Sequence, residues 1–113
     1  MTEEEKFVVR DYIEIPTHLL DFWLEKLSVM SFMFMMAIYR QCCFLGKKSV
    51  KISLDQFMLM MNLSKPSIAE MRKHCINYKV LKIIQEHDVT GRPKNTYYEI
   101  IYPEGCEVPP WMK

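Results

Sequence analysis

The sequence has no apolar run long enough to cross a membrane as a helix. Its most apolar stretch is VMSFMFMMAI at residues 29–38, and Arg40 and Gln41 follow soon after it. A spanning helix needs ~20 apolar residues, whereas a shorter helix that is apolar on nearly all sides is usually a buried central one. We therefore expect the core here. The many methionines leave a second role open, as a binding groove or a dimer face.

The sequence also lacks the cysteine and histidine spacing of a metal site. The residues concerned are Cys42, Cys43, Cys75, Cys106, His18, His74 and His87, and no two cysteines form a C-x-x-C pair. A disulfide between adjacent Cys42 and Cys43 would be strained, and the acidic start MTEEEKF does not have the pattern of a signal peptide. We expect reduced thiols, a cytoplasmic location and no bound metal.

No constellation of catalytic residues is recognisable. Catalysis needs a nucleophile, a base or a metal held in mutual reach. The neighbours His74 and Cys75 do not qualify, because adjacent residues of a helix point about 100° apart. We expect a protein that is not an enzyme and that binds no cofactor.

There is little net charge, only +1 at pH 7, but the charge is unevenly distributed. Residues 1–30 hold seven acidic and three basic residues, whereas residues 65–94 hold three acidic and seven basic ones. A neutral chain with a basic half can present one cationic face to a polyanion. The alternative is that these charges only keep the surface soluble.

Length and composition predict one domain with a packed core. The chain has 113 residues, half of them apolar, and only three glycines. Single domains cluster around ~100–150 residues. We expect an acidic segment at 1–11, an α+β domain at 12–102 and a flexible C-terminal tail at 103–113.

Capping residues predict where the first two helices begin. An extended segment, FVVRDYIEIP, precedes Thr17, which can cap a short helix over 18–27. Ser28 then opens the long apolar helix, which should run to about Phe44 and stop at Gly46.

The same signals predict two further helices and a hairpin. Ser53 and Gln56 fit a capping box, so a helix should start at Leu54 and end near Asn62. Ser64 before Lys65 and Pro66 predicts another helix as far as Asn77. Apolar spacing predicts strands at 50–52, 80–87 and 96–102, with residues 88–95 as the loop of the hairpin.

This order of elements resembles the winged helix-turn-helix superfamily. The resemblance is carried by YIEIPTHLLD, VKISLDQFMLMMNLSKPSIAEMRKHC and KVLKIIQEHDVTGRPKNTYYEII, and it covers residues 12–102. It is closest to the winged-helix domains of replication proteins from phages, plasmids and other mobile elements. The resemblance implies a helical core with a two-stranded C-terminal wing, plus an extra extended segment and a short helix at the start.

The resemblance also implies roles for individual residues. Residues 54–62 would be the positioning helix and 65–77 the recognition helix, whose N-terminal residues approach base edges. The residues implied in DNA binding are Lys65, Ser67, Ala69, Lys73 and Asn77 on that helix, Arg92, Lys94 and Asn95 in the wing, and Lys47, Lys48 and Lys51 beside it.

The aromatic residues of the basic half point to a different mode of binding. Tyr78, Tyr97 and Tyr98 lie among the cations Lys79 and Lys82 and those of the wing. Single-stranded DNA binds such surfaces because bases stack on the rings, at ~1–3 kcal/mol per base. These three tyrosines are candidates for stacking, although alternate strand residues must pack on the helices.

The sequence departs from the superfamily pattern on the recognition helix. Glu70 would repel phosphate unless it accepts a hydrogen bond from a cytosine amine, and no exposed Arg pair or Gln is present to read bases. Arg72 should lie at the edge of the buried side with its head emerging. This favours generic DNA affinity over sequence-specific binding.

These observations lead to one preferred function and two alternatives. The preferred function is a small DNA-binding protein for replication or maintenance of a mobile element, with modest sequence preference and with single- or double-stranded DNA as its target. One alternative is a dimeric transcriptional regulator that binds a duplex operator, with the Met-rich helix or Trp111 at the dimer face. The other is a protein-interaction adaptor whose tail, EVPPWMK, offers Trp111 to a partner. Monomer and homodimer both remain open, and we expect no membrane partner.

Overall fold

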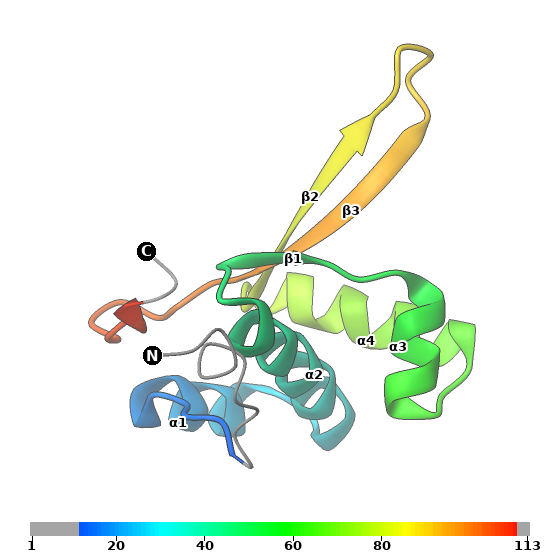
Figure 1. The fold of residues 1–113 in the computed structure, drawn as a ribbon. Coiled ribbons are helices and arrows are strands. Elements are labelled where there is room, and N and C mark those ends of the chain that lie inside the picture. Colours follow the sequence, from blue (N-terminus) through cyan, green and yellow to red (C-terminus); the bar gives the residue numbers. More distant parts are fainter. Residues whose placement is uncertain (1–11, 111–113) are drawn as a thin grey trace, which may run out of the picture.

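The long helix α2 (Val29–Leu45) is the centre of the fold, which the computed structural model describes for residues 12–110 (Figure 1). Ser28 begins the helix by accepting a hydrogen bond from the N–H of Ser31 at 3.2 Å. Gly46 ends it in the left-handed conformation (φ 65°), which glycine adopts at little cost. One side of the helix is buried, and this confirms that the apolar run forms the core. The buried residues are Ser31, Phe34, Met35, Ile38, Tyr39 and Cys42.

The short helix α1 (Thr17–Lys26) packs beside α2 through Trp23, whose ring lies edge-on to that of Tyr39 at 6.2 Å. The prediction that Thr17 caps this helix is wrong. Pro16 holds the capping position, and no side chain caps the helix. Residues 12–16 of the expected extended segment pair with none of the described strands, and residues 7–11 lie outside the described part. The hydroxyl of Tyr39 donates to the carbonyl of Glu14 and holds this segment against α2.

Helices α3 (Leu54–Met61) and α4 (Lys65–Asn77) begin where their capping residues predicted. The N–H of Ser53 donates to Oε1 of Gln56 at 2.8 Å, and the N–H of Gln56 donates to Oγ of Ser53 at 3.1 Å. Both halves of the expected capping box are therefore formed. Ser64 caps α4 by accepting from the N–H of Ser67 at 3.4 Å.

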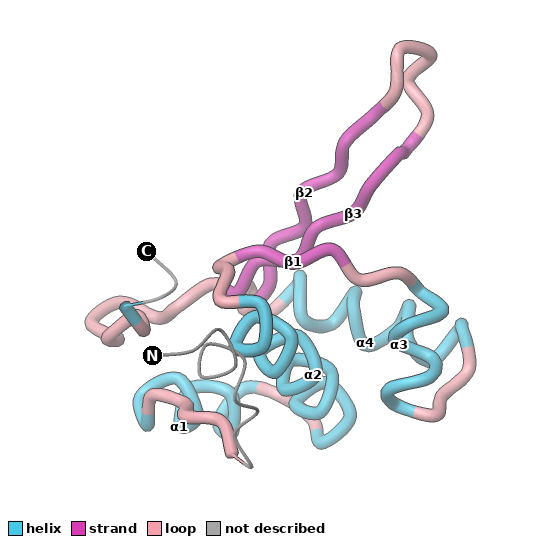
Figure 2. The backbone as a smooth tube through the Cα atoms, viewed as in Figure 1, coloured by secondary structure: helices cyan, strands magenta, loops and turns pink. Residues whose placement is uncertain are grey.

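Three strands form an antiparallel sheet in the order β1-β3-β2. They are β1 (Ser49–Lys51), β2 (Leu81–His87) and β3 (Pro93–Ile100). The hairpin β2–β3, called the wing below, stands well away from the helices (Figure 2). Its loop is shorter than predicted, because residues 93–95 already belong to β3. Pro93 is tolerated there since the first residue of a strand need not donate a ladder hydrogen bond.

Three aromatic rings join the sheet to the helices. Phe34 of α2 and Phe57 of α3 stack with their centroids 4.7 Å apart. The ring of Tyr98 on β3 lies edge-on to both of them, with its centroid 6.4 Å from that of Phe34 and 5.2 Å from that of Phe57. Together with the buried Leu81 and Ile100, Tyr98 thus fixes the base of the wing to the helices.

Residues after β3 turn back over the helices. The N–H of Ile101 donates to the carbonyl of Val80 at 3.0 Å. Tyr102, Cys106 and Val108 are partly buried against the core, so residues 103–110 of the expected flexible tail pack on the domain. Within residues 12–110, the structure is an α+β fold of four helices and three strands, compatible with a winged helix. No helix in this part of the chain is long and apolar enough to span a bilayer.

Replacing Phe57 by Ala should lower the free energy of unfolding by about 3–5 kcal/mol, because a fully buried aromatic ring is lost and a cavity remains. Urea unfolding followed by circular dichroism measures this. Leu59→Ala is the matched control on the same helix, since Leu59 is 84 % exposed. We expect that control to change the free energy by less than about 0.5 kcal/mol. Equal losses in the two variants would contradict this packing.

Candidate nucleic-acid interface

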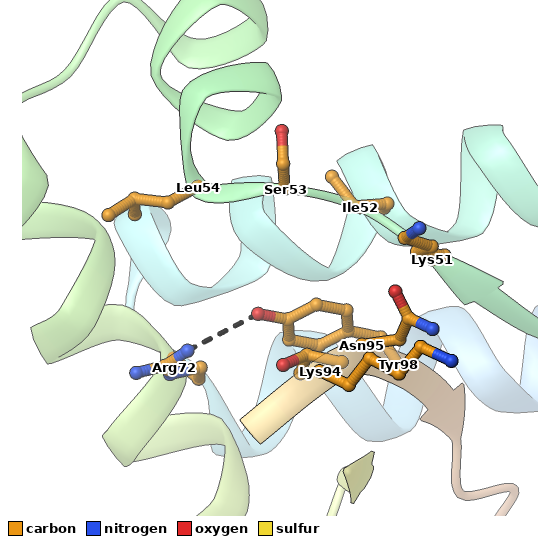
Figure 3. A pocket seen from close by; sticks show the side chains of 9 residues that line it. Lys51, Ile52, Ser53, Leu54, Arg72, Lys94, Asn95 and Tyr98 are labelled. Atoms are coloured by element: carbon orange, nitrogen blue, oxygen red, sulfur yellow. Dashed lines mark hydrogen bonds between the residues drawn. The ribbon is translucent and has the colours of Figure 1, made fainter. Parts of the chain in front are cut away.

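A hollow opens where the wing meets the helices (Figure 3). Its volume is about 230 Å³, and it is bounded by the end of β1, the start of α3, one side of α4 and the first half of β3. The residues that line it are Lys51, Ile52, Ser53, Leu54, Arg72, Lys94, Asn95, Thr96 and Tyr98. Three of these side chains are basic and none is acidic, so the hollow is cationic at neutral pH.

The register of the sheet creates this hollow. Strand β1 pairs only with residues 97–99 of β3, and Lys51 is its last paired residue. The chain then leaves the sheet through Ile52 and enters the capping box of α3. Residues 94–96 of β3 therefore lack a neighbouring strand on that side. Across the hollow from residues 94–96, the first residues of α3 form the other wall, and the positive end of the α3 helix dipole lies there.

Arg72 is held in the hollow by a tyrosine of the core. Its Nη1 donates to Oη of Tyr98 at 3.3 Å (Figure 3). Tyr98 is only 3 % exposed, and a buried tyrosine hydroxyl usually has a hydrogen-bond partner, which Arg72 supplies. Arg72 is half-buried, as expected for a residue at the edge of the buried side. The guanidinium is thus oriented before any ligand arrives.

The acidic residue of α4 lies on another side of the helix. Residues two positions apart on a helix point about 200° apart, so Glu70 and His74 both face away from Arg72. Nε2 of His74 lies 3.3 Å from Oε1 of Glu70. Lys65 and Ala69, by contrast, are seven and three residues before Arg72 and share its side. The carboxylate that was expected to repel phosphate is therefore directed away from the hollow.

The structure brings together only some of the residues that the sequence suggested. Lys51, Lys94 and Asn95 lie in the hollow. Lys47 and Lys48 precede the other end of β1. The hydroxyl of Ser67 lies 3.0 Å from that of Ser64, within the N-terminal cap of α4. The remaining suggested cations and polar residues are exposed along α4 and the wing: Lys65, Lys73, Asn77, Lys79, Lys82 and Arg92.

The prediction that Tyr98 stacks on bases is wrong, because its ring is buried among Phe34 and Phe57. Strand residues alternate between the two faces of a sheet, and Tyr98 lies on the core face with its partner Val50. Tyr97 lies on the other face opposite Ile84 and is half-buried, while Tyr78, after α4, is 52 % exposed. These two rings remain candidates for stacking. Trp111 lies outside the described residues.

The turn at the tip of the wing is organised by one carboxylate. Oδ1 of Asp88 accepts hydrogen bonds from the N–H of Thr90 at 2.9 Å, its hydroxyl at 2.6 Å and the N–H of Arg92 at 3.0 Å. These bonds favour the charged form and lower the pKa of Asp88. Gly91 adopts a positive φ of 86°, which closes the turn. Arg92 is thereby presented on a defined turn.

The thiols are not poised for chemistry at neutral pH. Burial raises the pKa of Cys42 and of Cys75 to about 12. Burial also raises the pKa of Cys43 and Cys106. A protonated thiol is a poor nucleophile and a poor metal ligand. Within residues 12–110, no three His, Cys, Asp or Glu side chains are grouped so that they could hold a metal ion.

The residues that sequence reasoning missed are Arg72 as a site residue, Ser53 and Thr96. Arg72 and Tyr98 are 26 positions apart, so no local pattern links them. Chemically, a hollow lined by three basic side chains and no acidic one suits an anionic ligand. Comparison of the chain with family models, curated proteins and solved structures finds no match.

The amide signals of Thr90 and Arg92 should titrate with Asp88. The pKa of this carboxyl is lower in the folded state than its usual value of ~3.9. The hydrogen bonds are therefore fully formed at neutral pH, and they are lost only when the pH falls through the lower folded-state pKa. Proton–nitrogen NMR spectra between pH 7 and 2 measure the midpoint. Asp88→Asn is the control and should abolish the titration of both amides. A midpoint at or above ~4 would contradict this turn.

Proposed function

We propose that the chain is a small, non-enzymatic DNA-binding protein that holds the sugar–phosphate backbone between its wing and α4. The observation that supports this is the hollow, whose lining includes Lys51, Arg72 and Lys94 and no carboxylate. A cleft lined by charges of one sign attracts ions of the opposite sign, so this lining suits an anionic ligand. A polyanion that passes along the wing would meet this site and the exposed cations around it.

A backbone phosphate suits the dimensions and donors of the hollow. A volume of about 230 Å³ holds a phosphate group together with several waters, each of which occupies about 30 Å³. A guanidinium has five N–H donors, and Tyr98 receives one hydrogen bond from Arg72. The others suit paired contacts to phosphate oxygens, which arginine makes better than lysine.

The proposed binding relies on charge more than on base reading. Ser67 is engaged in the cap of α4, and Glu70 is engaged with His74. Among the suggested base-reading residues, Lys65 alone offers a charged head on the side of Arg72. Counterion release would supply most of the affinity, and five phosphate contacts on duplex DNA give a log–log salt slope of roughly −4.

Single-stranded DNA is the second candidate ligand. The half-buried Tyr97 and the exposed Tyr78 favour it, because each leaves part of a ring open to a base. The burial of Tyr98 weakens the case for single-stranded DNA, because one of the three suggested stacking rings is lost. A role in replication or maintenance of a mobile element rests on the resemblance of the sequence alone, and so does the alternative of a duplex-operator regulator.

The variant Arg72→Ala/Lys94→Ala should weaken binding roughly 10- to 100-fold on every sequence alike, because two phosphate contacts are lost. The salt slope should flatten by about 2. Fluorescence anisotropy with unrelated duplex and single-stranded oligonucleotides of equal length, at several salt concentrations, measures both quantities.

Lys26→Ala is the control for this variant, because Lys26 lies on α1, far from the wing (Figure 1). It should bind like the wild type. Binding that is unaffected by the double substitution would remove the hollow from the mechanism. Failure of every oligonucleotide to bind at low salt would contradict the function itself and favour a protein-interaction adaptor.

Tyr98→Phe should weaken DNA binding about 3- to 10-fold, because Arg72 loses the acceptor that orients it while the aromatic packing remains. The discriminating readout is a double-mutant cycle with Arg72→Ala. In the Arg72→Ala background, Tyr98→Phe should have no further effect on affinity. An equal loss in both backgrounds would show that Tyr98 does not act through Arg72.

A further inference from the structure

The outer side of α2 carries exposed apolar side chains, although a surface helix normally has polar residues there. Val29 is 76 % exposed, Met33 48 % and Phe44 67 %. Met30 and Leu45 flank them at 40 % and 44 % exposed. Arg40 is the single charged residue among the 17 residues of this helix. Burial in the described core explains the inner side of α2 but leaves this outer side unexplained.

The outer residues form one straight stripe. Val29, Met33, Arg40 and Phe44 are spaced by four, seven and four positions, and Met36 and Ala37 are at the middle. These intervals keep side chains on one side of a helix with 3.6 residues per turn. The spacing also reads the same from either end, so it suits an antiparallel copy of the same helix.

The exposed area matches what a stable dimer needs. With about 150–200 Å² for each full side chain, the exposed fractions of the five apolar residues amount to about 500 Å². Standard interfaces bury about 800 Å² on each partner, and roughly 60–65 % of that area is non-polar. Apolar patches of this size on a monomer commonly mark an interaction site.

We propose that a second copy of the chain covers this stripe, with the two α2 helices antiparallel about a two-fold axis near Met36 and Ala37. Two-fold symmetry uses the same patch on both subunits. It places Val29 against Phe44 of the partner subunit, a small side chain against a large one. The short side chain of Ala37 allows the helices to approach at the crossing point.

Arg40 is compatible with this pairing. It is placed beside Met33 of the partner subunit, where its aliphatic stem packs and its guanidinium reaches the solvent at the rim. The two Arg40 residues are separated by about 10 Å along the helices, since each lies 3.5 residues from the axis at 1.5 Å per residue. That is about one Debye length at 0.1 M salt, so their repulsion is largely screened.

The dimer leaves both hollows accessible. The inner side of α2 packs on α4, β1 and β3, which also build the hollow, so the outer stripe faces the other way. This proposal does not rest on DNA binding, and it holds or fails by the state of association alone.

Sedimentation velocity from about 1 to 100 µM tests the proposal, since a standard interface of this size associates within that range. The wild type should pass from monomer to dimer. Met33→Lys should raise the dissociation constant at least about 30-fold, because it places a second cation beside Arg40 of the partner subunit. Phe44→Glu should have a similar effect, because each dimer would bury two unpaired carboxylates. Leu59→Glu is the control, because Leu59 is an exposed apolar residue on α3, outside the stripe, and this variant should dimerise like the wild type.

Circular dichroism melting of each variant separates a lost interface from a lost fold. A wild type that stays monomeric at 100 µM overturns the proposal and leaves a different protein as the partner of the stripe. A dimer that survives both Met33→Lys and Phe44→Glu also overturns it, because the interface must then lie elsewhere.

Crosslinking tests the antiparallel register. In a Cys43→Ser/Cys106→Ser background, a short bis-maleimide should link Ala37→Cys to itself, because this position lies at the axis. Val29→Cys alone should not link, since two copies of Val29 are about 20 Å apart in this register. An equal mixture of Val29→Cys and Phe44→Cys should link. Efficient linking of Val29→Cys alone would overturn the antiparallel arrangement.

Discussion

The site depends on the placement of one side chain, Tyr98. Its ring is wedged edge-on against Phe34 of α2 and Phe57 of α3, and its hydroxyl accepts a hydrogen bond from Arg72 of α4. A single residue of β3 thus contacts three helices. Burial of the ring anchors the base of the wing, and the contact of the hydroxyl with Arg72 stabilises the fold, because an unpaired buried hydroxyl costs about 1–3 kcal/mol.

This contact joins stability to binding. A free arginine side chain on a surface loses rotamer entropy when it clamps an anion, whereas Arg72 is already oriented by Tyr98. Burial of the ring against Phe34 and Phe57 excludes Tyr98 from base stacking. The chain therefore uses this aromatic residue to build the cationic hollow, and the rings still open to a ligand are Tyr97 on the opposite face of the sheet and Tyr78 after α4.

Local signals predicted the helices well because a cap is formed by residues three positions apart. Ser28, Ser53 and Ser64 begin their helices as expected, and the reciprocal contact of Ser53 with Gln56 is formed. Thr17 failed because Pro16 can itself precede a first helical turn, so the chain starts one residue earlier. The loop of the wing was predicted too long, since Pro93 was taken for a loop residue although it can begin a strand, and the predicted strand continued to residue 102 whereas β3 ends at Ile100.

The candidate site was harder to predict, because it is made by segments that meet only in the folded state. Lys51, Lys94 and Asn95 were suggested by charge and by position in the pattern. Their placement in one hollow with Arg72 follows from the register of β1 on β3, which the sequence does not reveal. The apolar pattern of α2 likewise predicted a buried helix. It could not distinguish the side that packs in the core from the side that remains exposed, because both sides carry the same kinds of residue.

The two proposals together suggest where sequence preference would come from. The side chains of α4 that could read bases are few, since Ser67 is engaged in the helix cap and Glu70 in its contact with His74. One hollow would therefore discriminate poorly between sequences. Two hollows on a dimer, however, must reach phosphates at a fixed separation, and the second contact gains from a high effective concentration only when the DNA presents its backbone at that separation. Preference would then arise from the shape and spacing of the DNA, with phosphate attraction supplying the affinity.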